Sequence, residues 1–520
     1  MEKIRYSVHT FMFPFQWDYL PSNPRHNIPY NGRTHLDDFD RLFSANSCLR
    51  RTKFQIDHSA EKYSEYNYFY PFVRKALYHT RDDDFMRYYE LEEEGGEYNI
   101  CIKNTKQTLS LTLNSICMHV FDTGVGVLAF NLSNYNHPHQ EDILLINDYG
   151  RRIYPLFLST KDGVDAPKGC FLADKIYGHL GDITFSDDFS QYEESIENNA
   201  CFLPPQHIRN VFGYTCKERI GDEGKDFVFR SDDERKKTVR IRQVTDDRMF
   251  FLCYYNNGNL ADKMAKKKSR DHCPRAELEY AFELDDFWYA FVYGDGKTPS
   301  VAEDRFQQEQ ILKCTYSRWL DNYAKHQENS GTLFAMTKDS FVCLGSWPLL
   351  ETHMLTMYYQ MAILCLVQRA SVLRFSYEIS QITRSIFGKR INLSKQIREI
   401  YENYITFLNR IYFREVTAQI QGIEMYAKFQ EAMNLEKEVK DLDNEIQELF
   451  EYENLQEQQR LNQIATLFLP ITLITGILGM NTFDACGTLS KYFLPINIAV
   501  TVSTIGVFIA FFKDSFKRKK

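Results

Sequence analysis

The sequence lacks the motifs of several protein classes. Its twelve cysteines are scattered singly, with no Cys-x-x-Cys pair and no histidines at zinc-ligand spacing, so it indicates neither a disulfide framework nor a structural metal site. The thirteen histidines include no His-Glu-x-x-His spacing. The segment Gly294–Thr298 ends like a phosphate-binding loop, but Phe291 stands where that loop needs its first glycine, which favours a hairpin turn. We therefore expect no catalytic residues, no covalently bound cofactor and no enzyme activity.

The N-terminus lacks an apolar run of signal-peptide length, so we expect most of the chain to remain in a reducing cytoplasm. At 520 residues, with 44% hydrophobic and 15% aromatic content, the chain is long enough for two or more domains with packed cores.

Charged residues are missing from two runs near the C-terminus. The first extends from Ile464 to Met480 and is long enough for a transmembrane helix if that helix begins near Leu461. The second, Tyr492 to Phe512, is long enough outright. A third apolar run, Met354 to Val367, is too short and is followed at once by a charge at Arg369. It predicts a buried helix of a folded domain.

The tail from Lys513 to Lys520 is basic, whereas the loop from Thr482 to Lys491 carries only Asp484 and Lys491 as charges. The positive-inside rule keeps such a tail in the cytoplasm. Two spans then place the N-terminus on the same side.

Proline is missing between Pro348 and Pro470, and glycine between Gly422 and Gly476, so nothing in the composition breaks a helix on the approach to the first run. Apolar residues recur there at alternating steps of four and three, which predicts a short coiled-coil seam: Leu435, Val439, Leu442, Ile446 and Leu449. A long helix that continues into a membrane span forms a stalk. A helix pair outside the membrane is the alternative.

The segment Arg460 to Asn481, with its short loop, second apolar run and basic tail, resembles the C-terminal pore region of CorA-type divalent-cation channels. The defining match is the Gly-Met-Asn motif, Gly479-Met480-Asn481, at the outer end of the first run, with Pro470 in mid-span. The resemblance covers about Phe429 to Lys520 well. It implies an α+β homopentamer in the bacterial inner membrane, with both termini cytoplasmic and the first spans around one central pore.

This reading divides the chain into four parts: a cytosolic mixed α/β sensor domain (1–345), long helices and a coiled-coil stalk (346–460), two transmembrane helices (461–512, with 461–481 lining the pore and 492–512 outside it) and a basic cytosolic tail (513–520).

At roughly 100° per residue, small or uncharged residues of the first span fall on one stripe: Gln458, Leu461, Ala465, Leu469, Thr472, Gly476 and Gly479. Such a stripe suits close helix packing or a narrow pore, and the resemblance favours the pore. Leu461 and Leu469 would form apolar constrictions. If the helix ends near Gly479, a ring of Asn481 amides would lie at the mouth and contact a hydrated cation such as Mg2+, the permeant or regulatory ion that the resemblance implies.

The N-terminal region has two strand-like runs around Asp122-Thr123-Gly124, which is a hairpin signal. The run from Asp142 to Leu158 also reads as two strands, with Arg151 and Arg152 at the turn between them. Paired arginines beside a glycine turn can hold a phosphate, and an ordinary exposed basic pair is the alternative. Asp222, in an acidic loop, is a further candidate for contacting the ribose or an amino group of a ligand.

Two functions remain. The segments Val8–Tyr19 and Ile146–Phe157 look like the CorA-like membrane effectors associated with type III CRISPR systems, which respond to a nucleotide second messenger, in some members a conjugate of S-adenosylmethionine with AMP. This resemblance implies a ligand-gated channel in antiviral defence that contacts itself, lipid and a small nucleotide, but no nucleic acid. The alternative is a Mg2+/Co2+ transporter gated by intracellular divalent metal.

Overall fold

The computed structural model describes most of the chain. The described residues are 3–21, 36–81, 85–102, 107–153, 172–189, 205–213, 227–230, 237–244, 247–268, 279–295, 301–320, 331–386, 393–479, 498, 499 and 502. Asp222, Met480, Asn481 and nearly all of the second charge-free run therefore lie outside the described residues.

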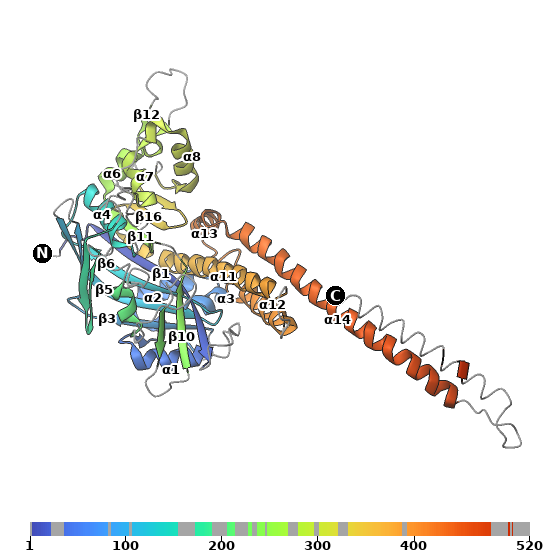
Figure 1. The fold of residues 1–520 in the computed structure, drawn as a ribbon. Coiled ribbons are helices and arrows are strands. Elements are labelled where there is room, and N and C mark those ends of the chain that lie inside the picture. The colour runs from blue at the N-terminus through green and yellow to red at the C-terminus, as the bar shows by residue number, and fades with distance from the viewer. Residues whose placement is uncertain are drawn as a thin grey trace, which may run out of the picture. The chain divides into compact units, whose positions relative to one another are not determined.

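Strands dominate the N-terminal part of the chain and helices dominate the C-terminal part (Figure 1). The strands are β1 Ser7–Pro21, β2 Arg50–Arg51, β3 Met86–Glu92, β4 Glu97–Ile102, β5 Gln107–Phe121, β6 Val125–Asn134, β7 Lys175–Leu180, β8 Ile183–Asp188, β9 Phe227–Arg230, β10 Lys237–Gln243, β11 Phe250–Asn256, β12 Lys267–Lys268, β13 Glu279–Tyr280, β14 Thr315–Tyr316, β15 Leu333–Met336 and β16 Ser340–Gly345.

The α-helices are α1 Leu36–Asn46, α2 Ala60–Tyr68, α3 Pro71–Leu77, α4 Gln140–Gly150, α5 Gln206–Val211, α6 Gly258–Met264, α7 Asp286–Tyr293, α8 Arg305–Cys314, α10 Pro348–Leu355, α11 Met357–Ile386, α12 Leu393–Arg410, α13 Ile420–Ala432 and α14 Leu435–Gly479. Short 3-10 helices are η2 Ile56–His58, η4 Ala281–Leu284 and η5 Val301–Glu303. The mixed N-terminal region and the long helices agree with the predicted α+β class.

Among the described residues, one fourteen-stranded sheet organises the N-terminal region, with the order β14-β15-β16-β11-β1-β6-β5-β4-β7-β8 and with β10, β9, β3 and β2 as branches. The pairs along this path are antiparallel except β11 with β16. Strand β1 is central because it changes partner along its length. Its first half pairs with β11, its second half pairs with β10, and its other edge pairs with β6.

Both faces of β1 are buried. Phe11, Phe15 and Trp17 lie on one face of β1. They belong to a core that also contains residues of α1, α4, α5 and α7. Because side chains alternate across a strand, Val8 and Met12 point to the opposite face, where α11 packs against β1 and β6. The N-terminal sheet thus lies between two helical layers.

Helix α11 contains most of the third apolar run, Met354 to Val367. The first two residues of this run end helix α10, and Thr356 separates the two helices. Every residue from Met357 to Val367 is buried, as expected of a helix that is apolar on all sides and therefore packs within a core. The prediction of a buried helix is confirmed for Met357–Val367, whereas the start of the run lies at the junction of two helices, where Leu355 and Thr356 are only partly buried. The hairpin prediction is also confirmed, because β5 and β6 pair around Asp122-Thr123-Gly124, and Gly124 has the positive φ (76°) that this turn needs.

Two local predictions are wrong. The run from Asp142 forms helix α4 rather than a strand, because four consecutive apolar residues suit a buried helix as well as a buried strand. Glu141 and Asp142 lie in its first turn, where acidic residues stabilise a helix. The Gly294 segment begins at the end of a helix and not of a strand: Gly294 is the left-handed C-cap of α7, with φ 60°. Residues 296–298 of this segment lie outside the described residues.

The chain divides into two compact units. The first comprises Met1–Ile391 and Glu399–Asp443, and the second comprises Asn392–Arg398 and Asn444–Lys520. The second unit contains most of α14. The domain boundaries that the sequence suggests at residues 345, 460 and 512 stay predictions.

Candidate functional site

Helix α14 carries the predicted stalk and the predicted pore stripe. It runs unbroken from Leu435 to Gly479 and passes through Pro470. It does not continue from α13, because Asn434 takes a left-handed conformation with φ 56° between the two helices. The long helix on the approach to the first charge-free run is therefore present, but it begins at Leu435.

The first apolar residues of the predicted coiled-coil seam pack against another helix of the same chain. Leu435, Val439 and Leu442 are each less than 7% exposed. The hydroxyl of Tyr404 on α12 donates to the carbonyl of Val439 at 3.4 Å, which identifies α12 as a neighbour of this part of the seam. These three residues are therefore covered by their own chain. For the start of the seam, this agrees with the alternative prediction of a helix pair outside the membrane.

The predicted pore stripe is exposed in one chain. Leu461 and Leu469 are 64% and 66% exposed, and Thr472 and Gly476 are also exposed. The Thr472 hydroxyl donates to the carbonyl of Phe468 at 2.6 Å, within the helix. A Cβ at Gly476 would meet nothing within 4 Å. Among the described side chains of this helix, large apolar ones such as Leu461 and Leu469 are therefore exposed.

The description of α14 stops at Gly479. The predicted helix end there stays a prediction, because Met480 and Asn481 lie outside the described residues. In the part of the chain that the structure describes, no helix combines the length and the apolar character needed to cross a membrane.

Arg151 and Arg152 follow helix α4, and both are buried. The Arg152 guanidinium forms ion pairs with two carboxylates: Nη2 lies 2.9 Å from Oδ1 of Asp148, one helical turn earlier, and Nη1 lies 2.9 Å from Oδ2 of Asp247. This arrangement connects the end of α4 to the segment that leads into β11.

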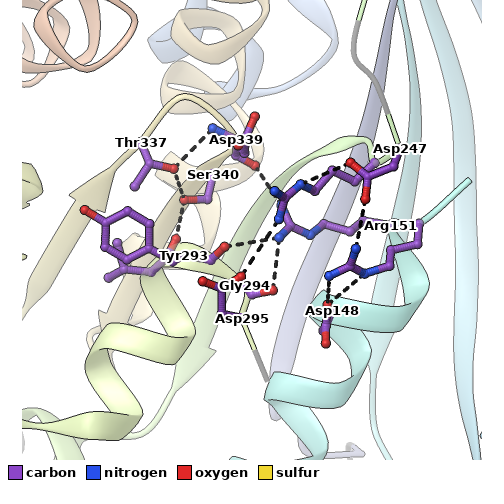
Figure 2. Close-up of polar contacts among 12 residues, drawn as sticks. Asp148, Arg151, Asp247, Tyr293, Gly294, Asp295, Thr337, Asp339 and Ser340 are labelled. Carbon is purple, nitrogen blue, oxygen red and sulfur yellow. Dashed lines mark hydrogen bonds and ion pairs between the residues drawn. The ribbon is translucent and has the colours of Figure 1, made fainter. Parts of the chain in front are cut away.

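The Arg151 guanidinium lies 4.8 Å from the centre of the Phe251 ring and bonds to main-chain carbonyls. Nη2 donates to the carbonyls of Tyr293 and Gly294 at 3.1 and 3.0 Å (Figure 2). Burial, and next the nearby Arg248 charge, lower the pKa of Arg151 to about 10. Glycine is required at position 294, since a Cβ there would lie 2.6 Å from Nη2 of Arg151.

The structure therefore places the two arginines in the interior and engages both guanidinium groups with protein partners. They are not an exposed basic pair, and a phosphate would have to compete with these carbonyls and carboxylates. Their predicted role in ligand binding stays a prediction, as does that of Asp222, which lies outside the described residues. Among the described residues, no group of three or more His, Cys, Asp or Glu side chains is arranged to hold a metal ion.

The two segments that resemble the membrane effectors pack against each other. The ring Nδ1 of His9, on β1, lies 2.7 Å from the side-chain oxygen of Asn147 on α4, and Gly150 lies against the Phe11 ring. The described residues of both segments thus contribute to the core, and residues 154–157 lie outside the described residues.

Residues 367–518 match the family model described as CorA-like Mg2+ transporter protein. The match covers less than a third of the 520 residues and supports the CorA family for the part from the middle of α11 to the basic tail. It includes the Gly-Met-Asn position and the second charge-free run. No curated protein and no solved structure matches the chain.

The CorA-like part contacts the N-terminal sheet through a residue that the sequence reading missed. Arg374 of α11 is 4% exposed, and its Nη1 donates to the carbonyls of Trp17 and Gly124 at 2.9 and 2.7 Å. Its Nη2 lies 3.1 Å from Oδ1 of Asp18 and its Nε lies 2.8 Å from Oε1 of Glu378. The only signal in the sequence was an arginine shortly after an apolar run.

Proposed function

We propose that this protein is a CorA-like membrane channel for divalent cations, built as a homopentamer with both termini in the cytoplasm. The single observation that carries the proposal is the family match over residues 367–518, which includes α14 and the charge-free runs. Members of this family are transporters or channels for Mg2+, so we expect transport rather than catalysis.

The exposed apolar side chains of α14 support an assembled pore. An isolated chain would leave Leu461, Ile464 and Leu469 in water, each more than half exposed. Five copies around an axis would cover part of this surface with neighbouring subunits and part with lipid. In the assembly, Leu461 and Leu469 would narrow the pore, and the Asn481 amides would contact a hydrated cation at the mouth.

The finer proposal concerns gating. We propose that a nucleotide second messenger, of the type that joins S-adenosylmethionine to AMP, opens the channel as part of type III CRISPR defence. Two features favour a regulated channel: the large N-terminal sheet, which the family match does not include, and the contacts of α11 with strands β1 and β6 of that sheet. The gating proposal does not depend on direct contact of the messenger with Arg151, Arg152 or Asp222.

Reconstitution tests both levels. The purified full chain is placed in liposomes loaded with a Mg2+-sensitive dye, and influx is measured with and without the S-adenosylmethionine–AMP conjugate. Influx that needs the conjugate supports the gated channel. Influx without the conjugate that is inhibited by Mg2+ on the side of the basic tail would support the transporter instead. No Mg2+ influx under either condition would contradict the channel itself.

A further inference from the structure

A cleft within the first unit combines cationic and apolar side chains. Its volume is about 330 Å3, which is within the range of pockets that bind small molecules. Its walls come from the ends of α7, α8 and α13 and from the turn between β15 and β16. The first two helices and the turn belong to the N-terminal region, whereas α13 belongs to the CorA-like part.

Lysines dominate the charge of the cleft. Lys313, Lys338 and Lys428 line it together with the carboxylates of Asp339 and Glu431. The carboxylates are already partly balanced, because Glu431 lies 3.9 Å from the Lys313 ammonium and Asp339 lies 4.0 Å from the Arg369 guanidinium just outside the cleft. This local excess of cations lies in a chain whose net charge is −8. The cleft therefore favours an anion.

The turn that carries Lys338 is held firmly. The Thr337 and Ser340 hydroxyls lie 2.7 Å apart, and the Asp339 N–H donates to the Thr337 hydroxyl at 3.2 Å. Figure 2 shows this turn beside Tyr293 and Arg151. The buried Arg151 lies behind the wall, where Nη1 donates to the carbonyl of Asp339 at 3.5 Å. The exposed Lys338 ammonium has no ion-pair partner among the described residues.

The apolar part of the cleft suits a flat ring. Tyr293 and Met336 line it, and the Tyr293 ring is supported by Tyr289, with ring centroids 4.7 Å apart. The Tyr293 hydroxyl points to the sulfur of Cys314 at 3.9 Å. A ligand that joins a ring to a phosphate can therefore pack its ring against the aromatic and thioether side chains and form charge-assisted hydrogen bonds from the ammonium groups to its phosphate.

We infer that this cleft binds a small organic phosphate, with its phosphate at Lys313, Lys338 and Lys428 and its ring at Tyr293 and Met336. The choice of an adenine nucleotide as ligand rests on the proposed function. The cleft also has a means of signalling, because the Lys428 ammonium of α13 donates to the carbonyl of Lys313 on α8 at 2.7 Å. A phosphate that takes over this ammonium would remove a contact between α8 and the CorA-like part.

The test is equilibrium binding of radiolabelled ATP and of the S-adenosylmethionine–AMP conjugate to the purified full chain in detergent. We expect Lys313→Glu/Lys338→Glu to weaken binding at least about 100-fold, since two charge-assisted contacts are replaced by repulsion. Both side chains are exposed, so the fold should survive. Lys75→Glu, an exposed lysine on α3, is the matched control and should bind like the unaltered protein. Ala432→Trp, which fills the cleft, should also abolish binding.

Competition separates the two parts of the ligand. Pyrophosphate should compete through the lysines alone, and adenosine should compete only weakly. Equal binding by the double variant and the unaltered protein would overturn the site, and so would failure of the unaltered protein to bind either nucleotide. Neither result would decide the proposed channel, because cation influx into liposomes is measured separately.

Discussion

The guanidinium of Arg374 donates to the main-chain carbonyl of Gly124 over 2.7 Å, and so connects helix α11 to the tip of the β5–β6 hairpin. The approach is close enough that a Cβ at Gly124 would lie 2.2 Å from Nη1 of Arg374. The same guanidinium reaches Asp18 and Trp17 on β1. A single buried cation therefore joins the first helix of the CorA-like part to strand β1 and to the β5–β6 turn of the N-terminal sheet.

Replacing this cation should destabilise the protein. Arg374→Ala leaves two carbonyls and the Glu378 carboxylate with fewer partners, and loss of one member of a buried ion pair costs about 3–5 kcal/mol. We expect a clear drop in the thermal unfolding midpoint of the purified protein. Arg305→Ala is the control, because its side chain is 89% exposed and its ion pair, among the described residues, is with exposed Glu309. Such a pair contributes less than about 1 kcal/mol. Equal midpoints for the two variants would show that the network contributes little.

The sequence predicted correctly those elements whose conformation is set by residues close together in the chain. The hairpin at Gly124 and the buried helix through Met357–Val367 follow from turn residues and from an uncharged run. Helix α4 was misread because Ile143–Ile146 has no period that separates helix from strand. The environment of Arg151 could not be predicted, since its partners Tyr293 and Asp339 are more than a hundred residues away in the chain.

In helix α14, too, the local conformation could be predicted from the sequence but the packing partner could not. The absence of proline before Pro470 predicted a long helix correctly. The partner of its first turns was not predictable from the spacing of Leu435 and Val439, because one apolar seam suits a helix of the same chain or of a neighbouring subunit equally well.

The carboxyl of Glu65 should make stability depend on pH. It is buried and accepts hydrogen bonds from Tyr78 at 3.1 Å and from Gln360 at 3.2 Å, and burial raises its pKa from 4.5 to about 7. A raised pKa in the folded state means that the protonated form stabilises the fold. This contribution is complete below about pH 4.5 and is lost as the pH rises through 7.

Glu65→Gln should remove this dependence, because the amide keeps an acceptor and carries no charge. The variant should gain stability relative to the unaltered protein between pH 5 and 8, by up to about 3 kcal/mol. Thermal unfolding at several pH values measures the difference. Glu61→Gln, an exposed position on the same helix, is the control and should follow the unaltered protein. A constant difference between Glu65→Gln and the unaltered protein at all pH values would contradict the buried, protonated carboxyl.

Arg152 should act as a structural cation. Arg152→Ala leaves Asp148 and Asp247 buried with one fewer cation, so we expect a loss of about 3–5 kcal/mol, read as a lower unfolding midpoint. Arg41→Ala, with a side chain that is 55% exposed, should change the midpoint much less. If Arg152→Ala unfolds at the same temperature as Arg41→Ala, the ion pairs with Asp148 and Asp247 do not support the fold.

The topology that we propose places the two ends of the second charge-free run on opposite sides of the membrane. Cys486 lies in the loop between the runs and should react with an impermeant thiol reagent in intact cells. A Ser515→Cys reporter in a Cys486→Ser background lies in the basic tail and should be protected until the cells are permeabilised. Labelling of the tail before permeabilisation would reverse the assigned orientation.

The last prediction concerns the pore mouth. If Asn481 supplies a ring of amide oxygens, Asn481→Ala removes the groups that contact the hydration shell of the cation, and Mg2+ influx into liposomes should fall or lose its preference for Mg2+ over Na+. The pentamer should remain intact on a sizing column, because the apolar residues of α14 are unchanged. Thr472→Val tests the same conduction path at a position deeper in the proposed pore, on the stripe of α14. It should reduce influx without affecting assembly. Asn409→Ala is the matched control: this asparagine is exposed on α12, and within the described part of the chain its side chain donates to the carbonyl of Ile405, one turn earlier on the same helix. Asn481→Ala pentamers that conduct with the rate and selectivity of the Asn409→Ala control would remove Asn481 from the conduction path, and would leave the Gly-Met-Asn motif as a helix end without a role in ion selection.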